Sequence, residues 1–523
     1  MQDVERVSAF RCSAGRPPHS SRENCMNSKS CFCAAIAAVL LCGVAVGQID
    51  RGSITGLTSD ATRSVVPNVE ITVRNEGTGI TTSTRSTTEG NYNIPGLPIG
   101  LYTVTATVPG FKMFKTSGMR VQVSTTTRLD IALEVGSVTE TVTVEAFNPL
   151  LQTDSAEVGS TINTERFLEL PLSLGGDIRN ASDFIRLQPG VAVSSTWEKH
   201  IAGGMSFSDA VYYDGAALSV TPANDKQYNP SVDAIEEFKL ISGNSSAEYG
   251  HALSGITSFT LKSGTNQLHG TLFEFLRNDK LDARGFFGST KAASRLNEYG
   301  ATLGGPVYIP RLYNGRNKTF VFGSFFSFRR RGGQLNNLST IPVPEFLTGD
   351  FRRWPDPIFD PRSNQTDPAT GRTIRTGFPN NMVPATRLSP VSRKIAALLP
   401  SPHLPDQITS NYISPLVSPL QDDDNFSIKM DHQISPNHKV FGSFIFTNRP
   451  AIKGAAPSVQ GEAESHNLQN LNSRFFRLSE DWTVSSRTVN HFVAYVNWIV
   501  DFNNSLSKGG NWGQRLGITG LQG

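Results

Sequence analysis

Cysteine is missing from almost all of this 523-residue chain, because its five cysteines lie within the first 42 residues. No disulfide framework, cysteine-based zinc site or thiol nucleophile can therefore form in the rest of the sequence. A basic excess is missing too, since 48 lysines and arginines are balanced by 45 acidic residues and the net charge is only +3. This balance argues against a nucleic-acid partner.

Apolar and charged residues are both scarce. Hydrophobic residues make up 38% of the chain, which is low for a bundle of membrane helices. Charged residues make up 18%, below the roughly 25% of a typical soluble domain. The frequent use of Gly, Thr, Asn and Phe favours β-structure, so we expect a mainly β fold.

Catalytic motifs are absent as well. None of the nine histidines begins a His-x-x-Glu metal motif. The sequence contains neither a Gly-x-Ser-x-Gly nucleophile elbow nor a phosphate-binding loop with the Gly-x-x-x-x-Gly-Lys pattern. We therefore expect no enzymatic activity, no catalytic or metal-binding residue and no cofactor.

The first 47 residues have the pattern of an export signal. Lys29 precedes a 16-residue apolar run, Cys31 to Val46, which ends in small residues typical of a cleavage site. This run is shorter than the ~20 residues that a spanning helix needs. We expect residues 1–47 to be a signal peptide, with translation starting at Met26, and the mature protein to be exported. A buried core helix is the alternative.

Residues 48–135 are predicted to form a small β-sandwich, because short Thr/Val/Ile strands alternate with turn clusters of Gly, Pro and Asn. The expected strands are Ser53–Thr58, Val69–Asn75, Ile80–Thr87, Leu101–Val108 and Thr126–Leu133. The runs Thr88–Ile94, Leu97–Val104 and Pro109–Phe111 resemble the carboxypeptidase regulatory-like domain. That family has a transthyretin-like or carbohydrate-binding-like sandwich fold, and the resemblance implies no peptidase activity.

Residues 147–265 carry a series of short motifs, with Ile162–Leu170 and Ala181–Leu187 apolar enough for short helices. The motifs are Gln188–Val191, Val211–Gly215, Val232–Phe238, Ala247–Gly250, Ser254–Thr257 and Thr260–Asn266. In this order they resemble the α/β plug of TonB-dependent outer-membrane receptors. The continuations His269–Asn278, Tyr299–Pro306 and Asn317–Phe322 resemble the Oar-like subgroup, which carries an N-terminal sandwich of this kind.

The resemblance assigns structural roles to one group of plug residues, a turn aspartate with its glycine and a packing motif. They are Asp214, Gly215, Glu248, Tyr249 and Gly250. Direct contact with a ligand is the alternative role for the polar members. The usual plug pattern has arginine-glycine pairs where this chain has Gly203-Gly204-Met205, so no ligand contacts are carried over there.

The linker 136–146 contains an extended, alternating segment of a type that adds as a strand to another protein's sheet edge. By the resemblance it is the candidate TonB box, which contacts a TonB-type energy transducer in the periplasm. The candidate box consists of Glu140, Thr141, Val142, Thr143 and Val144. The alternative is that this segment forms the last strand of the preceding sandwich.

Residues 267–523 alternate with the period of two that strands show. The expected strands are 267–276, 297–309, 319–330, 425–434, 439–447, 472–484 and 488–500. In the fourth, one face carries Phe426, Ile428, Met430, His432 and Ile434, and the other carries Ser427, Lys429, Asp431 and Gln433. Such alternation fits a sandwich core as well as a barrel wall. The connections of 20, 9, 94, 4, 24 and 3 residues favour a barrel, whose turns and external loops alternate in length.

The longest connection, residues 331–424, is rich in proline and is expected to be an extracellular loop rather than a domain. Arg329-Arg330-Arg331 at its base either contact anionic surface lipid or form a solvated loop base. Plugged barrels have ~22 strands, and the sequence predicts seven. We therefore expect an incomplete antiparallel transmembrane barrel in a chain that does not transport by itself.

The function implied by the resemblance is active uptake of an unidentified ligand, with a glycan-derived ligand as one option. We expect an outer-membrane receptor whose N-terminal domain and plug face the periplasm. Its expected partners are the TonB-type transducer, outer-membrane lipid and the extracellular ligand. One alternative is an outer-membrane adhesion or assembly protein that uses the barrel as a platform. A secreted carbohydrate-binding protein built around the N-terminal sandwich is a further alternative.

Overall fold

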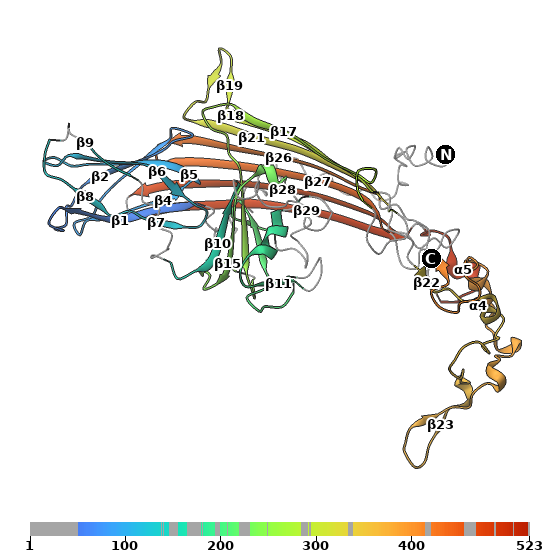
Figure 1. Cartoon of the computed structure of the whole chain (residues 1–523). Helices are drawn as coiled ribbons and strands as arrows, with labels where there is room; N and C mark the ends of the chain where they lie inside the picture. Colours follow the sequence, from blue (N-terminus) through green and yellow to red (C-terminus); the bar gives the residue numbers. More distant parts are fainter. Residues whose placement is uncertain are drawn as a thin grey trace, which may run out of the picture. The chain divides into compact units, whose positions relative to one another are not determined.

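The computed structural model describes most of the chain after residue 50. The described residues are 51–137, 139, 141–145, 155–164, 179, 181–193, 199–206, 208–218, 231–247, 249–250, 252–283, 291, 294–332, 338–413, 420–453, 467–485, 488–505 and 507–520. The predicted signal peptide lies outside them. Strands dominate the described chain in Figure 1, which confirms the predicted mainly β fold. No described helix combines the length and the apolar character needed to cross a membrane.

The N-terminal part is a two-sheet sandwich with an apolar interior. Its strands are β1 (Gly52–Asp60), β2 (Glu70–Asn75), β3 (Thr81–Arg85), β4 (Asn91–Leu97), β5 (Gly100–Thr107), β6 (Met113–Val121), β7 (Thr126–Arg128), β8 (Ile131–Leu133) and β9 (Thr141–Glu145). One sheet has the order β3-β2-β5-β6-β9, and in the other β1 pairs with β4, β7 and β8. Alternate residues such as Ile71, Val73 and Val104 are buried between the sheets, while their neighbours face water.

Two strands of the sandwich were not expected from the sequence. β4 lies where the Thr88–Asn91 and Pro95–Gly100 clusters indicate turns, but Tyr92 and Ile94 are buried and hold it in the core. β6 contains Gly118, which has a positive φ of 75° and lies within the segment where the β5–β6 register shifts. Glycine inside a strand weakens the strand signal, and here it marks a bulge.

A mixed five-stranded sheet follows, which we call the central sheet. It consists of β10 (Val158–Asn163), β13 (Ala210–Tyr213), β14 (Ala216–Ala217), β15 (Ile235–Gly243) and β16 (Ile256–Leu261), in the order β10-β15-β16-β13-β14. Two short 3₁₀ helices, η1 (Ala181–Leu187) and η3 (Val232–Ala234), belong to the same part of the chain. Of the two expected helices, Ala181–Leu187 is thus 3₁₀. Ile162 and Asn163 instead end β10, and residues 165–170 lie outside the described residues.

The C-terminal half forms a seven-stranded antiparallel sheet, which we call the long sheet. Its strands are β17 (His269–Asn278), β18 (Ser294–Pro306), β21 (Thr319–Gly332), β26 (Leu420–Ser435), β27 (His438–Lys453), β28 (Asn467–Ser485) and β29 (Thr488–Ser505). They are neighbours in chain order, as Figure 1 shows. All seven predicted strands are present, most of them longer than expected. Residues 307–318 contain the small hairpin of β19 (Tyr308–Ile309) and β20 (Tyr313–Asn314), so this turn is longer than the sequence suggested.

The long sheet buries both polar and apolar residues on its inner face, and on β26 the apolar residues are the exposed ones. Its inner face, defined by Phe322, Ile445 and Phe475, packs on the apolar cluster of the central sheet. On β26 the inner residues Ser427 and Lys429 are buried. The outer face of the same strand carries Phe426, Ile428, Met430 and Ile434, all of them exposed. The predicted division of β26 into two faces therefore holds, and its apolar face is the exposed one.

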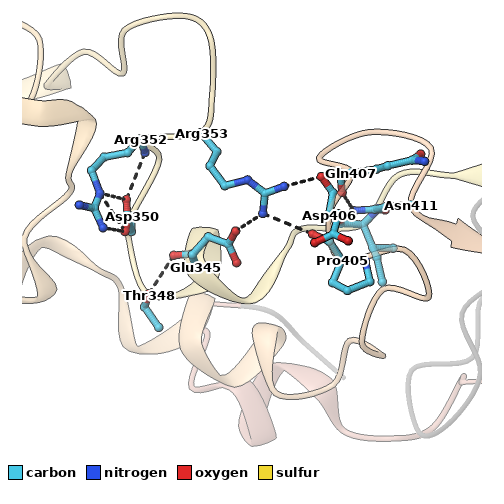
Figure 2. A network of polar contacts seen from close by, with 10 residues as sticks. Glu345, Thr348, Asp350, Arg352, Arg353, Pro405, Asp406, Gln407 and Asn411 are labelled. Carbon is cyan, nitrogen blue, oxygen red and sulfur yellow. Dashed lines mark hydrogen bonds and ion pairs between the residues drawn. The ribbon is translucent and has the colours of Figure 1, made fainter.

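The connection between β21 and β26 contains ordered structure. Its elements are β22 (Leu338–Ser339), α3 (Pro344–Leu347), η4 (Pro361–Ser363), β23 (Gln365–Thr366), β24 (Thr373–Ile374), η5 (Pro379–Asn381), η6 (Ala385–Arg387), α4 (Pro390–Ala396) and β25 (Tyr412–Ile413). Figure 2 shows Arg353 bridging Glu345 and the backbone of Pro405 and Asp406. Buried Asn411 bonds both N–H and C=O of Ile341. The sequence of residues 331–424 lacks periodicity and predicted a loop, but the described part of this segment is locally folded. After β29, α5 (Trp512–Leu516) follows, and Lys394 Nζ donates to the carbonyl of Arg515 at 3.0 Å.

Candidate functional site

The candidate TonB box forms an edge strand of the sandwich. Thr141–Glu145 is β9, which pairs in parallel with β6 from Met113↔Thr141 to Ser117↔Glu145. The structure therefore shows the alternative that the sequence left open, a last strand of the sandwich. The second edge of β9 has no partner strand among the described residues, and such an edge is a template for a further strand. Glu140 lies outside the described residues.

Asp214 lies in the turn between β13 and β14 and also binds the long sheet. Asp214 and Gly215 have positive φ values of 47° and 78°, as in a tight Asp-Gly hairpin turn. Asp214 Oδ1 accepts hydrogen bonds from the N–H of Leu261 at 3.1 Å and from Lys429 Nζ at 3.0 Å. Lys429 Nζ also donates to the Leu261 carbonyl at 2.9 Å. Both side chains of this ion pair are buried, so it joins the central sheet to the inner face of β26.

A second buried ion pair joins the segments next to the central sheet to the long sheet, with the opposite polarity. Arg179 donates through Nε to Glu298 of β18 at 2.5 Å and through Nη2 to Asp233 of η3 at 2.7 Å. Its guanidinium also stacks on the Phe275 ring, 4.0 Å from the centroid. Removing one partner of a buried pair typically costs 3–5 kcal/mol, because the other charge is left without compensation. The two pairs therefore fix the central sheet against the long sheet at β18 and β26.

The predicted packing motif is only partly described. Tyr249 packs edge-on against Tyr212, with ring centroids 5.6 Å apart, and its hydroxyl bonds Ser124 Oγ at 2.8 Å. The carbonyl of Gly250 accepts a hydrogen bond from the Tyr212 hydroxyl at 3.0 Å. Both residues thus contact Tyr212, while their role stays a prediction. Glu248 lies outside the described residues.

The arginines at the end of β21 bind aspartates of β26. Arg329 Nη2 lies 2.7 Å from Asp424 Oδ1, and Arg331 Nη1 lies 2.6 Å from Asp422 Oδ1. Their charge is therefore balanced within the protein. This pairing favours the loop-base alternative over contact with anionic lipid.

A cavity of about 360 Å³ lies where residues of the sandwich, the central sheet and the long sheet meet. Arg51 and Lys439 line it together with both polar and apolar neighbours. The Arg51 guanidinium stacks on Phe441, 3.7 Å from the ring centroid, and its Nε lies 3.6 Å from Asp481 Oδ2. The volume is in the range of small-molecule pockets.

Sequence reasoning missed the charged partners of the predicted residues. Lys429 was placed on the polar face of its strand, but nothing in the sequence connects it to Asp214, which lies 215 positions earlier. Arg179 and Glu298 are separated by 119 positions. The sequence did offer one signal for the pair, which is Lys429 in the middle of a predicted barrel strand. An ionisable residue inside a membrane segment is a functional candidate by default.

Two family matches agree with this architecture. Residues 260–523 match the family described as outer membrane beta barrel domain. Residues 53–134 match the carboxypeptidase regulatory-like domain.

Individual proteins are similar as well. The TonB-dependent transporter Oar of Myxococcus xanthus is 25% identical over 292 residues, which cover 53% of this chain and 27% of the relative. Solved structures include the siderophore receptor PirA of Pseudomonas aeruginosa (12% identity, TM-score 0.35, 66% of this chain and 41% of that one). The outer membrane transporter YddB of Escherichia coli is a second solved structure that is similar. It is 12% identical, with a TM-score of 0.41, and the match covers 66% of this chain and 40% of that one. This chain thus spans about a quarter of the curated relative and two fifths of the structures.

Proposed function

This chain belongs to the outer membrane β-barrel domain family, and on that premise we propose that it is a TonB-dependent receptor for uptake of an extracellular ligand. It is an outer-membrane protein. In this proposal the long sheet is part of the barrel wall and the central sheet is the plug. The sandwich and the plug face the periplasm, where the transducer is located.

The observation that carries the proposal is the inverted polarity of β26, whose apolar face is exposed and whose polar face is buried against the central sheet. A soluble sheet exposes its polar face, whereas the exposed side chains of β26 are Phe426, Ile428, Met430 and Ile434. Outward-facing apolar residues that alternate with polar inward ones are the pattern of a transmembrane barrel strand. The inner charges Lys429 and Glu298 are then balanced by the plug residues Asp214 and Arg179.

The proposed mechanism uses the free edge of β9. A TonB-type transducer adds a strand there, as edge strands permit, and pulls on the chain that leads into the plug. The pull acts on β10, which pairs along its whole length with β15 of the central sheet. Separation of the plug from the wall then requires the pairs Asp214–Lys429 and Arg179–Glu298 to break.

Site-directed cross-linking tests the transducer contact. Thr143→Cys places a thiol on exposed β9, and Thr81→Cys is a matched control on exposed β3 at the opposite end of the same sheet. Each is introduced into the full chain with its five native cysteines replaced by serine. We expect a disulfide to a cysteine-bearing TonB-type protein from Thr143→Cys and none from Thr81→Cys. Equal cross-linking of both variants would contradict a specific box.

The adhesion or assembly alternative has one observation in its favour, the folded segment between β21 and β26. An ordered external segment of this kind serves as a binding module without any transducer. Deleting Glu140–Val144 separates the two functions. A receptor then loses energised uptake and keeps surface binding, whereas an adhesin is unaffected.

The sandwich gives no support to a glycan ligand. All aromatic residues of the predicted sandwich 48–135, Tyr92, Tyr102, Phe111 and Phe114, lie in or against its core. Sugar binding by stacking needs exposed rings. We therefore assign ligand recognition to the external segments rather than to the sandwich.

A further inference from the structure

A short loop of the sandwich is held by three side chains of the central-sheet region. The loop, residues 122–125, connects β6 to β7. Glu237 Oε2 accepts a hydrogen bond from the N–H of Val123 at 2.7 Å. Lys239 Nζ donates to the carbonyl of Ser124 at 2.6 Å, and the Tyr249 hydroxyl bonds Ser124 Oγ at 2.8 Å. Three separate side chains thus converge on two consecutive loop residues.

These contacts are buried and mutually supporting. Glu237 and Lys239 are two positions apart on β15, so their side chains project from the same face. Both are almost completely buried, as is Val123. Ser124 has a positive φ of 47°, which turns its carbonyl and hydroxyl toward these partners. A buried carboxyl group and a buried ammonium with specific partners resist separation, because each is costly to leave without a hydrogen-bond partner.

Lys239 connects more than two segments. Besides the Ser124 carbonyl, its Nζ binds Glu157 Oε2 at 2.8 Å. Glu157 directly precedes β10, the strand that pairs with β15. One ammonium therefore holds the sandwich loop, the entry to β10 and strand β15 together.

The loop also lies on a continuous path from the candidate box. β9 pairs with β6 over five residues, and β6 runs directly into loop 122–125. A pull on β9 that shears this ladder is therefore passed to the loop, and from the loop to β15. The covalent connection from β9 to β10 also ends at this point, at Glu157.

We propose that Glu237, Lys239 and Tyr249 form a latch that docks the sandwich on β15. The latch also holds Glu157, at the start of β10, against β15 until the sandwich is pulled away. The docking is a property of the chain alone. Its role as the first step of plug release rests on the proposed function. Force applied to the sandwich then reaches the central sheet by two routes, through the latch contacts and through the covalent linker from β9 to β10.

The test measures the distance between the two parts in the full chain in detergent micelles. Spin labels are attached at Thr81→Cys in the sandwich and Met205→Cys outside it, both exposed, with the native cysteines replaced by serine. We expect one narrow distance distribution. Combining Glu237→Ala with Lys239→Met should broaden it, and hydrogen exchange at Val123 should accelerate at least roughly tenfold, since hydrogen bonds to charged groups are lost.

Matched variants keep the test decisive. Lys112→Met removes an exposed ion pair within the sandwich, to Glu134 at 3.4 Å, and should leave the distribution narrow. Tyr249→Phe removes only one hydroxyl and should accelerate exchange at Ser124 without unfolding. If the double variant stays folded and keeps the narrow distribution, the latch is wrong. A working latch in a protein whose Thr143→Cys variant never cross-links to a transducer would refute the proposed function and leave the latch standing.

Discussion

Strand β2 of the sandwich and strand β26 of the long sheet both alternate in polarity, but β2 buries its apolar face and β26 buries its polar face. In β2 the buried residues are Ile71 and Val73, and polar neighbours lie at the surface. In β26 the buried residues include Ser427 and Lys429, and the exposed ones are Ile428 and Met430. Period-two alternation alone therefore identifies a strand and its two faces. Which face is buried depends on the surroundings, which are water for the sandwich and, for β26, lipid on one side and a partly polar interior on the other.

The largest effect should come from a charge in the sandwich core. Ile71→Lys buries an ammonium with no partner, and we expect a loss above about 4 kcal/mol in the free energy of unfolding. Thr72→Lys, on the opposite face of β2, should cost less than about 1 kcal/mol. The rate of proteolysis within residues 51–137 of the full chain measures the loss of stability in both variants. Similar resistance of the two variants would refute the assigned faces.

A slightly smaller effect should follow from an apolar residue on the inner face of the long sheet. Lys429→Met leaves Asp214 buried without its cation, and we expect a loss of about 3–5 kcal/mol. Denaturant titration of the full chain in micelles measures it. Combining Lys429→Met with Asp214→Asn should restore much of the stability, because neither charge then remains and asparagine keeps both the turn and an acceptor for the Leu261 N–H. Additive losses in the double variant would show that the two residues do not interact.

A charge on the outer face of the long sheet should cost less than one in the sandwich core. Ile428→Lys in the middle of β26 should lose about 2–4 kcal/mol in lipid vesicles, as lysine does at the bilayer midplane. Ile428→Val is the conservative control and should stay close to the parent. If Ile428→Lys is as stable as the parent, this face does not contact lipid.

The junction between the two parts should respond to pH. Burial, and to a smaller extent Glu236, raise the pKa of the Glu237 carboxyl, while the Val123 N–H, Arg120 and Gln122 lower it, and the net pKa is about 7. Lys239 projects from the same face of β15. A raised pKa means that the docked form binds the proton more tightly than the undocked form. Docking should therefore be strongest below about pH 4.5, the carboxyl's ordinary value, and weaken up to about pH 7.

The spin-label distance between residues 81 and 205 measures this pH effect. We expect the distribution to broaden as the pH rises from 4.5 to 7. Glu237→Gln mimics the protonated acid, so it should keep the narrow distribution at both ends of the range. A pH response that persists in Glu237→Gln would assign the titration to another group.

The sequence predicted what depends on neighbouring residues along the chain. The seven strands of the long sheet and the two faces of β26 follow from alternation between adjacent positions. It did not predict β4, because Pro95-Gly96 marks a turn locally while burial of Tyr92 and Ile94 maintains the strand. The pairing of β9 with β6 was left as an alternative, since an extended segment has the same pattern in either role.

The charged contacts lay beyond sequence reasoning for a different physical reason. Asp214 and Lys429, or Glu237 and Val123, meet only after separate sheets have packed. Composition and spacing carry no information about such long-range pairs. Asp214 was predicted as a turn residue and does occupy a turn. The sequence did not predict its ion pair with Lys429 of the long sheet, which only the structure shows.

Solvent accessibility along β26 tests most directly whether the long sheet is a membrane wall. Cysteines are introduced one at a time at positions 424–434 of the full chain, spin-labelled and reconstituted in lipid vesicles. We predict that labels at 426, 428 and 430 collide with oxygen, which concentrates in lipid, and hardly with a water-soluble nickel complex. Labels at 427 and 429 should be shielded from both reagents. Collisions with the nickel complex at 426, 428 and 430 would contradict the account, because the apolar face would then be in water.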